Sequence, residues 1–233
     1  MAQSPPYTPE DLAREAPPAD QAALAACGER VRQRLAADPG AYRLPTDRAE
    51  IFAFGDFLAP AECDRLIALV DATAKPSAIF KHAAGNDFRT SYSGDVDRND
   101  PLVRMVERRI DDLLGFEPDH GETVQGQRYH PGQQFKAHCD WFWTIADYWP
   151  DESRRGGQRA WTAMAYLNAV EEGGATEFSR LGLSVQPRQG ALLVWNNALP
   201  DGRPNIDTLH AALPVVRGTK YVVTKWYRTR RWG

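Results

Sequence analysis

Apolar residues recur at intervals of three and four in three stretches of the first half of the chain, the spacing of a helix with one buried face. These stretches cover residues 20–37, 60–73 and 101–114. The third follows Asp100, a residue type that caps helices, and begins with Pro101, which is tolerated in a first turn. We therefore expect three amphipathic helices before residue 115.

Beyond Gly115 the helical spacing stops, and short runs of alternating apolar and polar residues follow, separated by Gly, Pro and Asp. Alternation with a period of two is typical of strands, and many short strands joined by such turns are typical of a sandwich or jelly roll. The sequence therefore predicts an α+β, mainly β, fold. The predicted strands cover residues 51–58, 122–129, 135–142, 160–168, 182–187, 191–197, 208–216 and 220–227.

The start of the chain differs in composition from the rest, because it is rich in Ala, Pro and charged residues and has no β-branched run. Thr8 and Pro9 are typical of a helix start, so we expect a short helix there, before the one over 20–37. We predict an N-terminal helical appendage over 1–45, packed on one domain over 46–233. The appendage is a candidate contact in a homodimer.

The bulk composition limits the class of protein. Hydrophobic residues make up 42% and charged residues 25% of the 233 positions, close to globular averages. A formal charge of −3 gives no overall field that attracts nucleic acid or an anionic membrane. The first residues do not show the basic and then apolar pattern of a secretory leader, and no apolar run approaches the roughly 20 residues of a membrane helix. With three cysteines far apart, we expect a cytoplasmic protein without nucleic-acid or membrane partners.

A histidine and an aspartate lie two residues apart in the predicted strand over 135–142. Because side chains alternate along a strand, His138 and Asp140 should share a face. An imidazole and a carboxylate are two of the three ligands in the facial triad that holds iron(II). The pair by itself is weak evidence, since two such residues can equally form a polar pair on a strand surface.

A third ligand is required, and His210 is the best candidate. It lies in the predicted strand over 208–216, late in the chain, where a jelly roll can bring a distant strand beside the first. The other histidines, His82, His120 and His130, lie in stretches rich in Gly, Asp or Pro. We expect these three in solvent.

The motifs around these residues resemble, in order and spacing, the prolyl 4-hydroxylase branch of the 2-oxoglutarate- and iron(II)-dependent oxygenases, over residues 46–233. The shared features are a Tyr nine residues before His-x-Asp, a GGxTxF segment, a strand ending in Trp, a later His, a Lys ten residues beyond it, a Lys-Trp pair, and an upstream Arg-Thr-Ser. In this chain they are Tyr129, His138 with Asp140, 173–178, 190–195, His210, Lys220, Lys225 with Trp226, and 89–91.

The resemblance implies a double-stranded β-helix (jelly roll) core with flanking helices, and a hydroxylase that uses iron(II), 2-oxoglutarate and dioxygen, with ascorbate as a candidate reductant. It implies that the catalytic residues His138, Asp140 and His210 hold the iron. Lys220 would bind the distal carboxylate of 2-oxoglutarate, and Tyr129 would add a hydroxyl donor. A buried carboxylate does need a charge-assisted partner. Alternatively, Lys220 extends to water and Tyr129 is an ordinary strand aromatic.

The chain departs from the family pattern at two positions near the expected peptide. The family usually has a Tyr three residues before the first iron-binding His and a His two residues after the Trp of Lys-Trp, whereas this chain has Phe135 and Arg228. Arg228 and Arg89 together would suit a substrate with a carboxylate; alternatively, Arg228 begins an exposed basic tail. Trp226 either lines the pocket or fills the core. The substrate is therefore expected to be a prolyl peptide, an amino acid or another small molecule.

Two other functions stay open. A non-catalytic jelly-roll module that binds or senses 2-oxoglutarate would keep the same pocket. A zinc-dependent enzyme could use the same three ligands, although the sequence shows no evident general base. The aromatic stretch that contains Trp141, Trp143 and Trp149 either closes over the pocket as a lid, up to residue 157, or covers the edge of the sheet.

Overall fold

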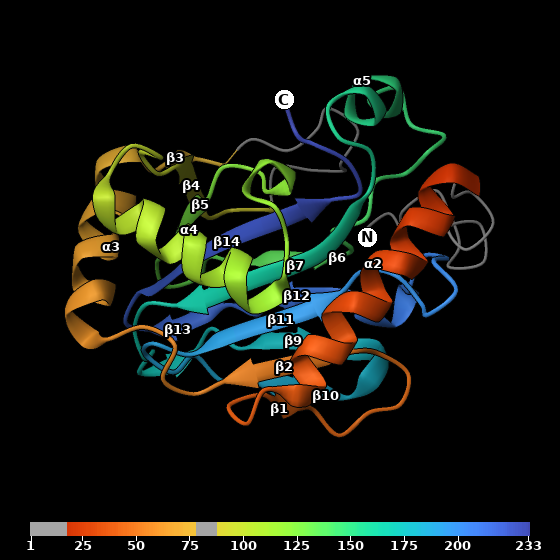
Figure 1. Ribbon diagram of the computed structural model, residues 1–233. Helices are drawn as coiled ribbons and strands as arrows, with labels where there is room; N and C mark the ends of the chain where they lie inside the picture. The colour runs from red at the N-terminus through yellow and green to blue at the C-terminus, as the bar shows by residue number, and fades with distance from the viewer. Residues whose placement is uncertain (1–17, 78–87) are drawn as a thin grey trace.

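The computed structural model describes residues 18–77 and 88–233, which form three layers: helices, a large sheet and a small sheet (Figure 1). The large sheet has the strand order β1-β2-β11-β7-β14-β5-β4-β3, the small sheet has the order β10-β9-β12-β6, and β13 pairs with β8. All of these pairs are antiparallel. This arrangement agrees with the predicted α+β, mainly β, jelly roll.

The strands are short, and most begin or end at a Gly or Pro turn. Their bounds are β1 (Tyr42–Arg43), β2 (Ile51–Phe54), β3 (Lys75–Pro76), β4 (Tyr92–Asp95), β5 (Gln125–Tyr129), β6 (Phe135–His138), β7 (Arg159–Tyr166), β8 (Glu172–Gly173), β9 (Thr176–Phe178), β10 (Leu183–Val185), β11 (Leu192–Asn196), β12 (His210–Ala212), β13 (Val215–Arg217) and β14 (Lys220–Arg228).

Three helices cover the outer face of the large sheet: α2 (Pro18–Ala37), α3 (Pro60–Thr73) and α4 (Pro101–Leu114) (Figure 1). They coincide with the three predicted helices. The side chain of Asp100 accepts a hydrogen bond from the Leu102 backbone N–H, and Gly115 ends α4 with φ 74°. The remaining helices are α5 (Trp149–Arg154) and the 3₁₀ turns η1 (Pro118–His120), η2 (Ser179–Leu181) and η3 (Ile206–Thr208).

The large sheet is the middle layer, so both of its faces are buried. One apolar cluster joins its outer face to the helices, and a second fills the space between the two sheets. Along β14, Val223 belongs to the first cluster and Val222 to the second, as alternation requires. Lys220 and Thr224 share the inward face with Val222 and are therefore held between the sheets, away from bulk water.

Two differences between the predicted and the observed strands affect the positions of His138, Asp140 and His210. β6 ends at His138, so Asp140 lies just beyond the strand instead of within it. The predicted strand over 208–216 is divided into β12 and β13, which belong to different sheets. Pro214 stands between them and has no N–H to continue the ladder.

The N-terminal helix α2 packs on the large sheet as expected, because Leu24, Cys27, Val31 and Leu35 belong to the same buried cluster as the sheet. The division at residue 45 and the homodimer stay predictions. The short helix expected after Thr8 lies outside the described residues.

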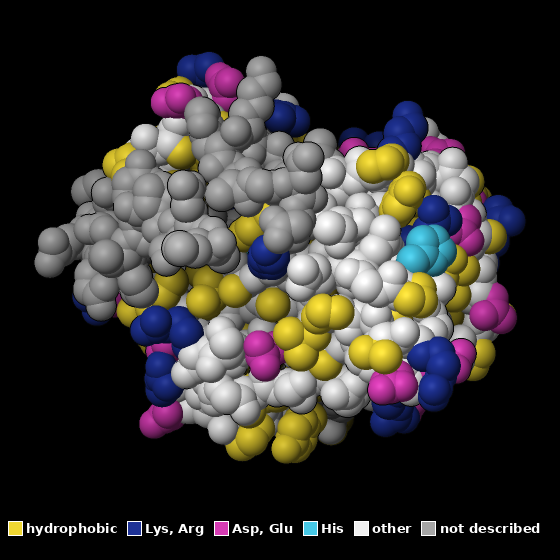
Figure 2. All heavy atoms as spheres, turned by 180° about the vertical axis from the view of Figure 1, so that it is seen from behind, with side chains coloured by type: hydrophobic (Ala, Val, Ile, Leu, Met, Phe, Trp, Pro, Cys, Tyr) yellow, Lys and Arg dark blue, Asp and Glu magenta, His cyan; other side chains and the backbone are white. Residues whose placement is uncertain are grey.

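The surface carries charges of both signs. On the face seen from behind, Lys and Arg side chains lie among Asp and Glu, with no wide field of one sign (Figure 2). Over 18–77 and 88–233, no helix is both long enough and apolar enough to cross a membrane.

Candidate metal and cosubstrate site

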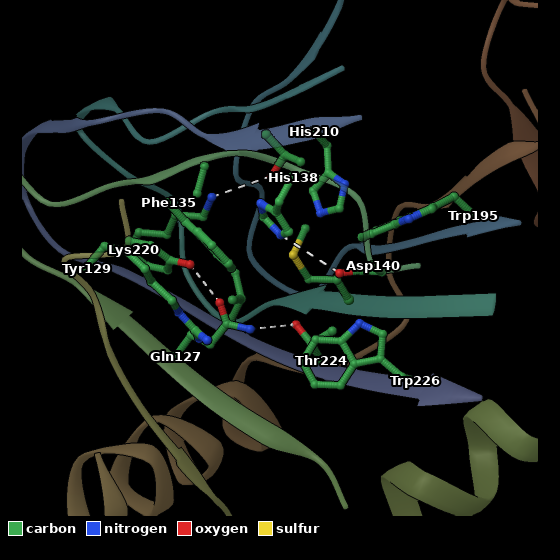
Figure 3. A pocket seen from close by; sticks show the side chains of 15 residues that line it. Gln127, Tyr129, Phe135, His138, Asp140, Trp195, His210, Lys220, Thr224 and Trp226 are labelled. Carbon is green, nitrogen blue, oxygen red and sulfur yellow. Dashed lines mark hydrogen bonds and ion pairs between the residues drawn. The ribbon is translucent and has the colours of Figure 1, made fainter. Parts of the chain in front are cut away.

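Three predicted metal ligands come together at the edge of the space between the sheets (Figure 3). His138 at the end of β6 and His210 at the start of β12 are direct cross-strand partners, and their ring centroids are 4.3 Å apart. Asp140 turns back toward them, so that one ligand atom from each residue lies within 4.8 Å of the others. Among the residues that the structure describes, they form the one cluster of this kind that could hold a metal ion.

Both imidazoles are held by backbone carbonyls. Nδ1 of His138 lies 2.8 Å from the Lys136 carbonyl oxygen, and Nδ1 of His210 lies 3.0 Å from that of Thr208. Because a carbonyl only accepts, Nδ1 carries the proton in each ring and Nε2 keeps its lone pair for a metal. The same carbonyls fix the orientation of the rings.

The electrostatics of His138 and Asp140 favour the forms of these two residues that bind a metal. Burial, with the neighbouring His210, lowers the pKa of His138 to about 3. Burial would raise the pKa of Asp140, but the two histidines and Arg159 hold it below its ordinary value. Neutral imidazoles and an ionised carboxylate are the metal-binding forms. The cluster therefore fits a divalent cation such as iron(II), with two nitrogen ligands and one oxygen ligand.

The carboxylate of Asp140 is oriented by a hydrogen-bond chain that the sequence did not reveal. Thr162, on β7, donates from Oγ1 to Asp140 Oδ2 at 2.7 Å, and Asn197 Nδ2 donates to Thr162 Oγ1 at 3.0 Å. All three side chains are buried. Thr162 thus directs one carboxylate oxygen and leaves Oδ1 facing His138 Nε2 at 3.8 Å.

Replacing Thr162 by valine should weaken metal binding about ten-fold, because outer hydrogen-bond partners of metal ligands typically contribute 10–100-fold in affinity. The substitution keeps the side-chain shape but removes the donor to Asp140. The dissociation constant for the metal measures the effect, with thermal unfolding as a check on folding. Thr123→Val, at a half-buried position away from the cluster, is the matched control. Equal metal affinity in Thr162→Val and the parent would show that this bond does not orient the ligand.

A buried cation lies across the pocket from the cluster. Lys220 is 1% exposed, and Nζ has the Thr176 hydroxyl at 3.5 Å as a weak partner. Burial lowers the pKa of Lys220 to about 7. No ion pair to a carboxylate of the described residues compensates it. A buried ammonium without an anion is unfavourable, so this end of the pocket suits an anionic ligand.

The other uncommitted polar groups of the pocket are also donors. The indole N–H groups of Trp195 and Trp226 are buried and have no hydrogen-bond partner among the described residues. Arg89 donates to Gln125 and Ser91, which are both neutral. The pocket therefore fits an acceptor-rich acid that reaches from the metal cluster to Lys220. 2-Oxoglutarate has this character, with a 2-oxo acid group at one end and a carboxylate at the other.

Three residues predicted to contact substrate line the same pocket. The ring of Phe135 stacks on His138, with centroids 3.6 Å apart and planes at 17°. The Arg89 guanidinium carbon lies 4.7 Å from the Phe135 ring centroid. Trp226 lines the pocket and packs beneath Arg159, whose guanidinium carbon lies 4.1 Å from its ring. The arrangement places these side chains beside the metal cluster.

The environment of Arg228 agrees with neither of the two roles expected from the sequence. It is 2% exposed and is neither a charge at the pocket mouth nor part of an exposed tail. Its guanidinium donates to Glu122, Glu152 and the Gly157 carbonyl. These two carboxylates compensate its charge, so Arg228 is not available to a substrate. The contact to Glu152 joins α5, within the aromatic stretch considered as a lid, to β14.

The other histidines have different environments. His130 is exposed, as expected. His120 is half-buried instead of solvated, because its Nδ1 contacts the Arg228 carbonyl oxygen at 3.2 Å and its ring packs near Phe116. His82 lies outside the described residues. None of these rings joins the metal cluster within the described part of the chain.

Sequence reasoning missed several polar residues of the pocket. Gln127 and Thr224 share strand faces with Tyr129 and Lys220, so the period-two alternation could have indicated both. Thr176 lies in the GGxTxF segment, for which the sequence suggested no contact in the pocket. Thr162, which contacts Asp140, lies in the predicted strand over 160–168, and no local signal distinguishes it.

Comparisons with known proteins agree with this geometry. Residues 124–228 match the family model of the 2OG-Fe(II) oxygenase superfamily. "Probable prolyl 4-hydroxylase 3" of Arabidopsis thaliana is 32% identical over 199 residues, which cover 75% of this chain and 68% of that protein. "Prolyl 4-hydroxylase 1" of the same organism is 33% identical over 201 residues, covering 77% and 69%.

A solved structure extends the match to the fold. The viral collagen prolyl hydroxylase of Paramecium bursaria Chlorella virus-1, in a 2-oxoglutarate complex, has a TM-score of 0.59 at 28% identity, covering 76% of this chain and 94% of that one. Taken with the sequence relatives, it shows that the chain is a 2-oxoglutarate-dependent hydroxylase with a jelly-roll fold. The chain belongs to the prolyl 4-hydroxylase-like branch of the 2-oxoglutarate- and iron(II)-dependent oxygenases.

Proposed function

We propose that this hydroxylase acts on prolyl residues in a peptide, with iron(II) held by His138, Asp140 and His210 and the distal carboxylate of 2-oxoglutarate bound by Lys220. The observation that carries the proposal is the pocket itself. A cluster of two imidazoles and a carboxylate faces a buried lysine, and within the described residues this lysine has no carboxylate partner and the free groups of the pocket are donors.

The residues of the site have separate roles. When bound, iron(II) and 2-oxoglutarate would supply the activation of dioxygen and the oxidising equivalents for hydroxylation, with release of succinate and carbon dioxide. His138 and His210 present Nε2 because the backbone holds Nδ1. Phe135, Trp195 and Trp226 form apolar walls that exclude water from the centre of the pocket.

The peptide part of the proposal is supported by the relatives, which are named prolyl 4-hydroxylases. One observation favours a second substrate class. Arg89 reaches the pocket with neutral partners, and burial lowers its pKa, so a carboxylate on a small acid would be a suitable ligand. Phe135 lacks the hydroxyl that the family usually offers at its position.

A substrate panel tests the proposal. Protein loaded with iron under nitrogen is mixed with 2-oxoglutarate, exposed to air, and assayed for succinate and for a mass gain of one oxygen. We expect both products with proline-containing peptides and not with free amino acids or small acids. Products only with small acids would overturn the peptide part. Binding of 2-oxoglutarate without succinate across the whole panel would indicate a non-catalytic module, and activity with zinc alone would indicate a zinc enzyme.

The affinity for 2-oxoglutarate should depend on pH through Lys220. Its pKa is about 7 in the free site, below the ordinary 10.5, and a bound carboxylate favours the protonated form. Lys220 is protonated below pH 7, so the affinity for 2-oxoglutarate should not change with pH in that range. Above pH 7 binding must take up a proton, and affinity should fall by up to about ten-fold per pH unit. Titrations at several pH values measure this slope, which Lys220→Arg should remove because arginine stays charged.

The proposal includes two finer points from the sequence: ascorbate as the reductant and a cytoplasmic location. Ascorbate should extend the number of turnovers without changing the affinity for 2-oxoglutarate. Equal turnover numbers with and without ascorbate would remove it from the proposal.

A further inference from the structure

A buried glutamine stands between the two ends of the pocket. Gln127 lies on β5 between Gln125 and Tyr129, and the three side chains share the inward face of the strand. β5 pairs with β14 in a register that places Tyr129 opposite Lys220. Gln127 lies opposite Val222, two residues along β14 from Lys220 and toward Trp226.

Gln127 connects two hydroxyl groups (Figure 3). The hydroxyl of Tyr129 donates to Gln127 Oε1 at 2.6 Å, and Gln127 Nε2 donates to Thr224 Oγ1 at 3.1 Å. The three residues are 6%, 2% and 3% exposed, in the order Gln127, Tyr129 and Thr224. Bulk water therefore does not compete for these bonds.

The amide of Gln127 gives this series of hydrogen bonds a fixed direction from donor to acceptor. A phenol carries one proton, and the proton of Tyr129 is committed to the amide oxygen of Gln127. Thr224 accepts from the amide nitrogen, so its own hydroxyl proton is the one left for another acceptor. Thr224 lines the pocket. Thr176, beside Lys220, also keeps its own hydroxyl proton, because it accepts from Tyr166 at 2.7 Å and from Lys220 at 3.5 Å.

We propose that Gln127 is a positioning residue that withholds the Tyr129 proton from the carboxylate beside Lys220 and leaves the threonine hydroxyls, Thr176 and Thr224, as the hydroxyl donors of the pocket. This inference rests on the proposed binding of 2-oxoglutarate. It reverses the expectation from the sequence that Tyr129 adds a hydroxyl donor to the cosubstrate. Its consequence is that Gln127 weakens cosubstrate binding, because it satisfies a hydroxyl that would otherwise gain a charged partner on binding.

Gln127→Met tests the idea, because methionine keeps the length of the side chain and removes both hydrogen bonds. Calorimetric titration of 2-oxoglutarate into manganese(II)-loaded protein measures binding without turnover. We expect Gln127→Met to bind about ten-fold more tightly than the parent, the net contribution of one hydrogen bond to a charged group. Tyr129→Phe should change affinity less than about two-fold in the parent, and Gln127→Met should bring no gain in the Tyr129→Phe background.

Gln33→Met, at an exposed position of α2, controls for the change from glutamine to methionine and should bind as the parent does. Weaker or equal binding by folded Gln127→Met would overturn the inference, as would a ten-fold loss in Tyr129→Phe. If Gln127→Met does not fold, the Tyr129→Phe comparison decides alone: unchanged affinity supports the inference, and a clear loss overturns it. Failure of the manganese-loaded parent to bind 2-oxoglutarate would instead overturn the proposed cosubstrate site, and this inference with it.

Discussion

Replacing His210 by alanine is expected to abolish iron binding and, with it, the formation of succinate. The cluster has three protein ligands, and His210 supplies one of its two nitrogens. Since loss of an outer partner alone typically costs 10–100-fold in metal affinity, loss of a ligand should cost more than about 100-fold. Metal content after dialysis measures the first effect, and succinate released in air measures the second. His138→Ala and Asp140→Ala should behave in the same way.

The matched control is His130→Ala, which removes an exposed histidine from the same domain. It should retain metal and activity. Because Asp140 is buried beside the two rings, thermal unfolding of each variant should be recorded, so that loss of metal is separated from loss of fold. A His210→Ala protein that is folded and keeps the parent's metal content would remove His210 from the assignment.

Replacing Lys220 by alanine is expected to raise the dissociation constant for 2-oxoglutarate by about 100-fold while leaving metal binding intact. Removing one partner of a buried charge pair costs roughly 2–5 kcal/mol, because the other charge is left without compensation. In the free protein the same change removes a buried ammonium that has no carboxylate partner among the residues 18–77 and 88–233, so the fold should not be weakened by loss of an ion pair.

Lys75→Ala is the control, since Lys75 is exposed on the edge strand β3 and does not line the pocket. The two effects are separated by titrating the metal and 2-oxoglutarate independently. A Lys220→Ala protein with the parent's affinity for 2-oxoglutarate would mean that another cation binds the distal carboxylate, and Arg89 would be the next candidate. Loss of metal together with loss of 2-oxoglutarate would indicate a structural collapse of the pocket instead.

The candidate site was predictable where its residues lie close together in sequence or recur on one strand face. The side chains of His138 and Asp140 come together as predicted. β6 ends before Asp140, but the chain turns back toward His210 at that point. Lys220 could be recognised because it is a charged residue at an inward position of an otherwise apolar strand. Thr162 was hidden, since a threonine in an apolar strand is ordinary and its contact to Asp140 spans 22 positions.

The sequence by itself determined the three helices and most of the longer strands, because periodicity records which face of each element is buried. The short strands β1, β3, β4, β8 and β9 have too few residues to show a period. The sequence also determined the composition of the metal cluster and the cation opposite it. Only the tertiary structure decided which partners individual charged groups and hydroxyl protons have. Arg228 is compensated by Glu122 and Glu152, and the Tyr129 proton goes to Gln127. The reason is geometric: a hydrogen bond depends on about 3 Å of separation and on direction, and partners from distant segments reach that separation only after the sheets have packed.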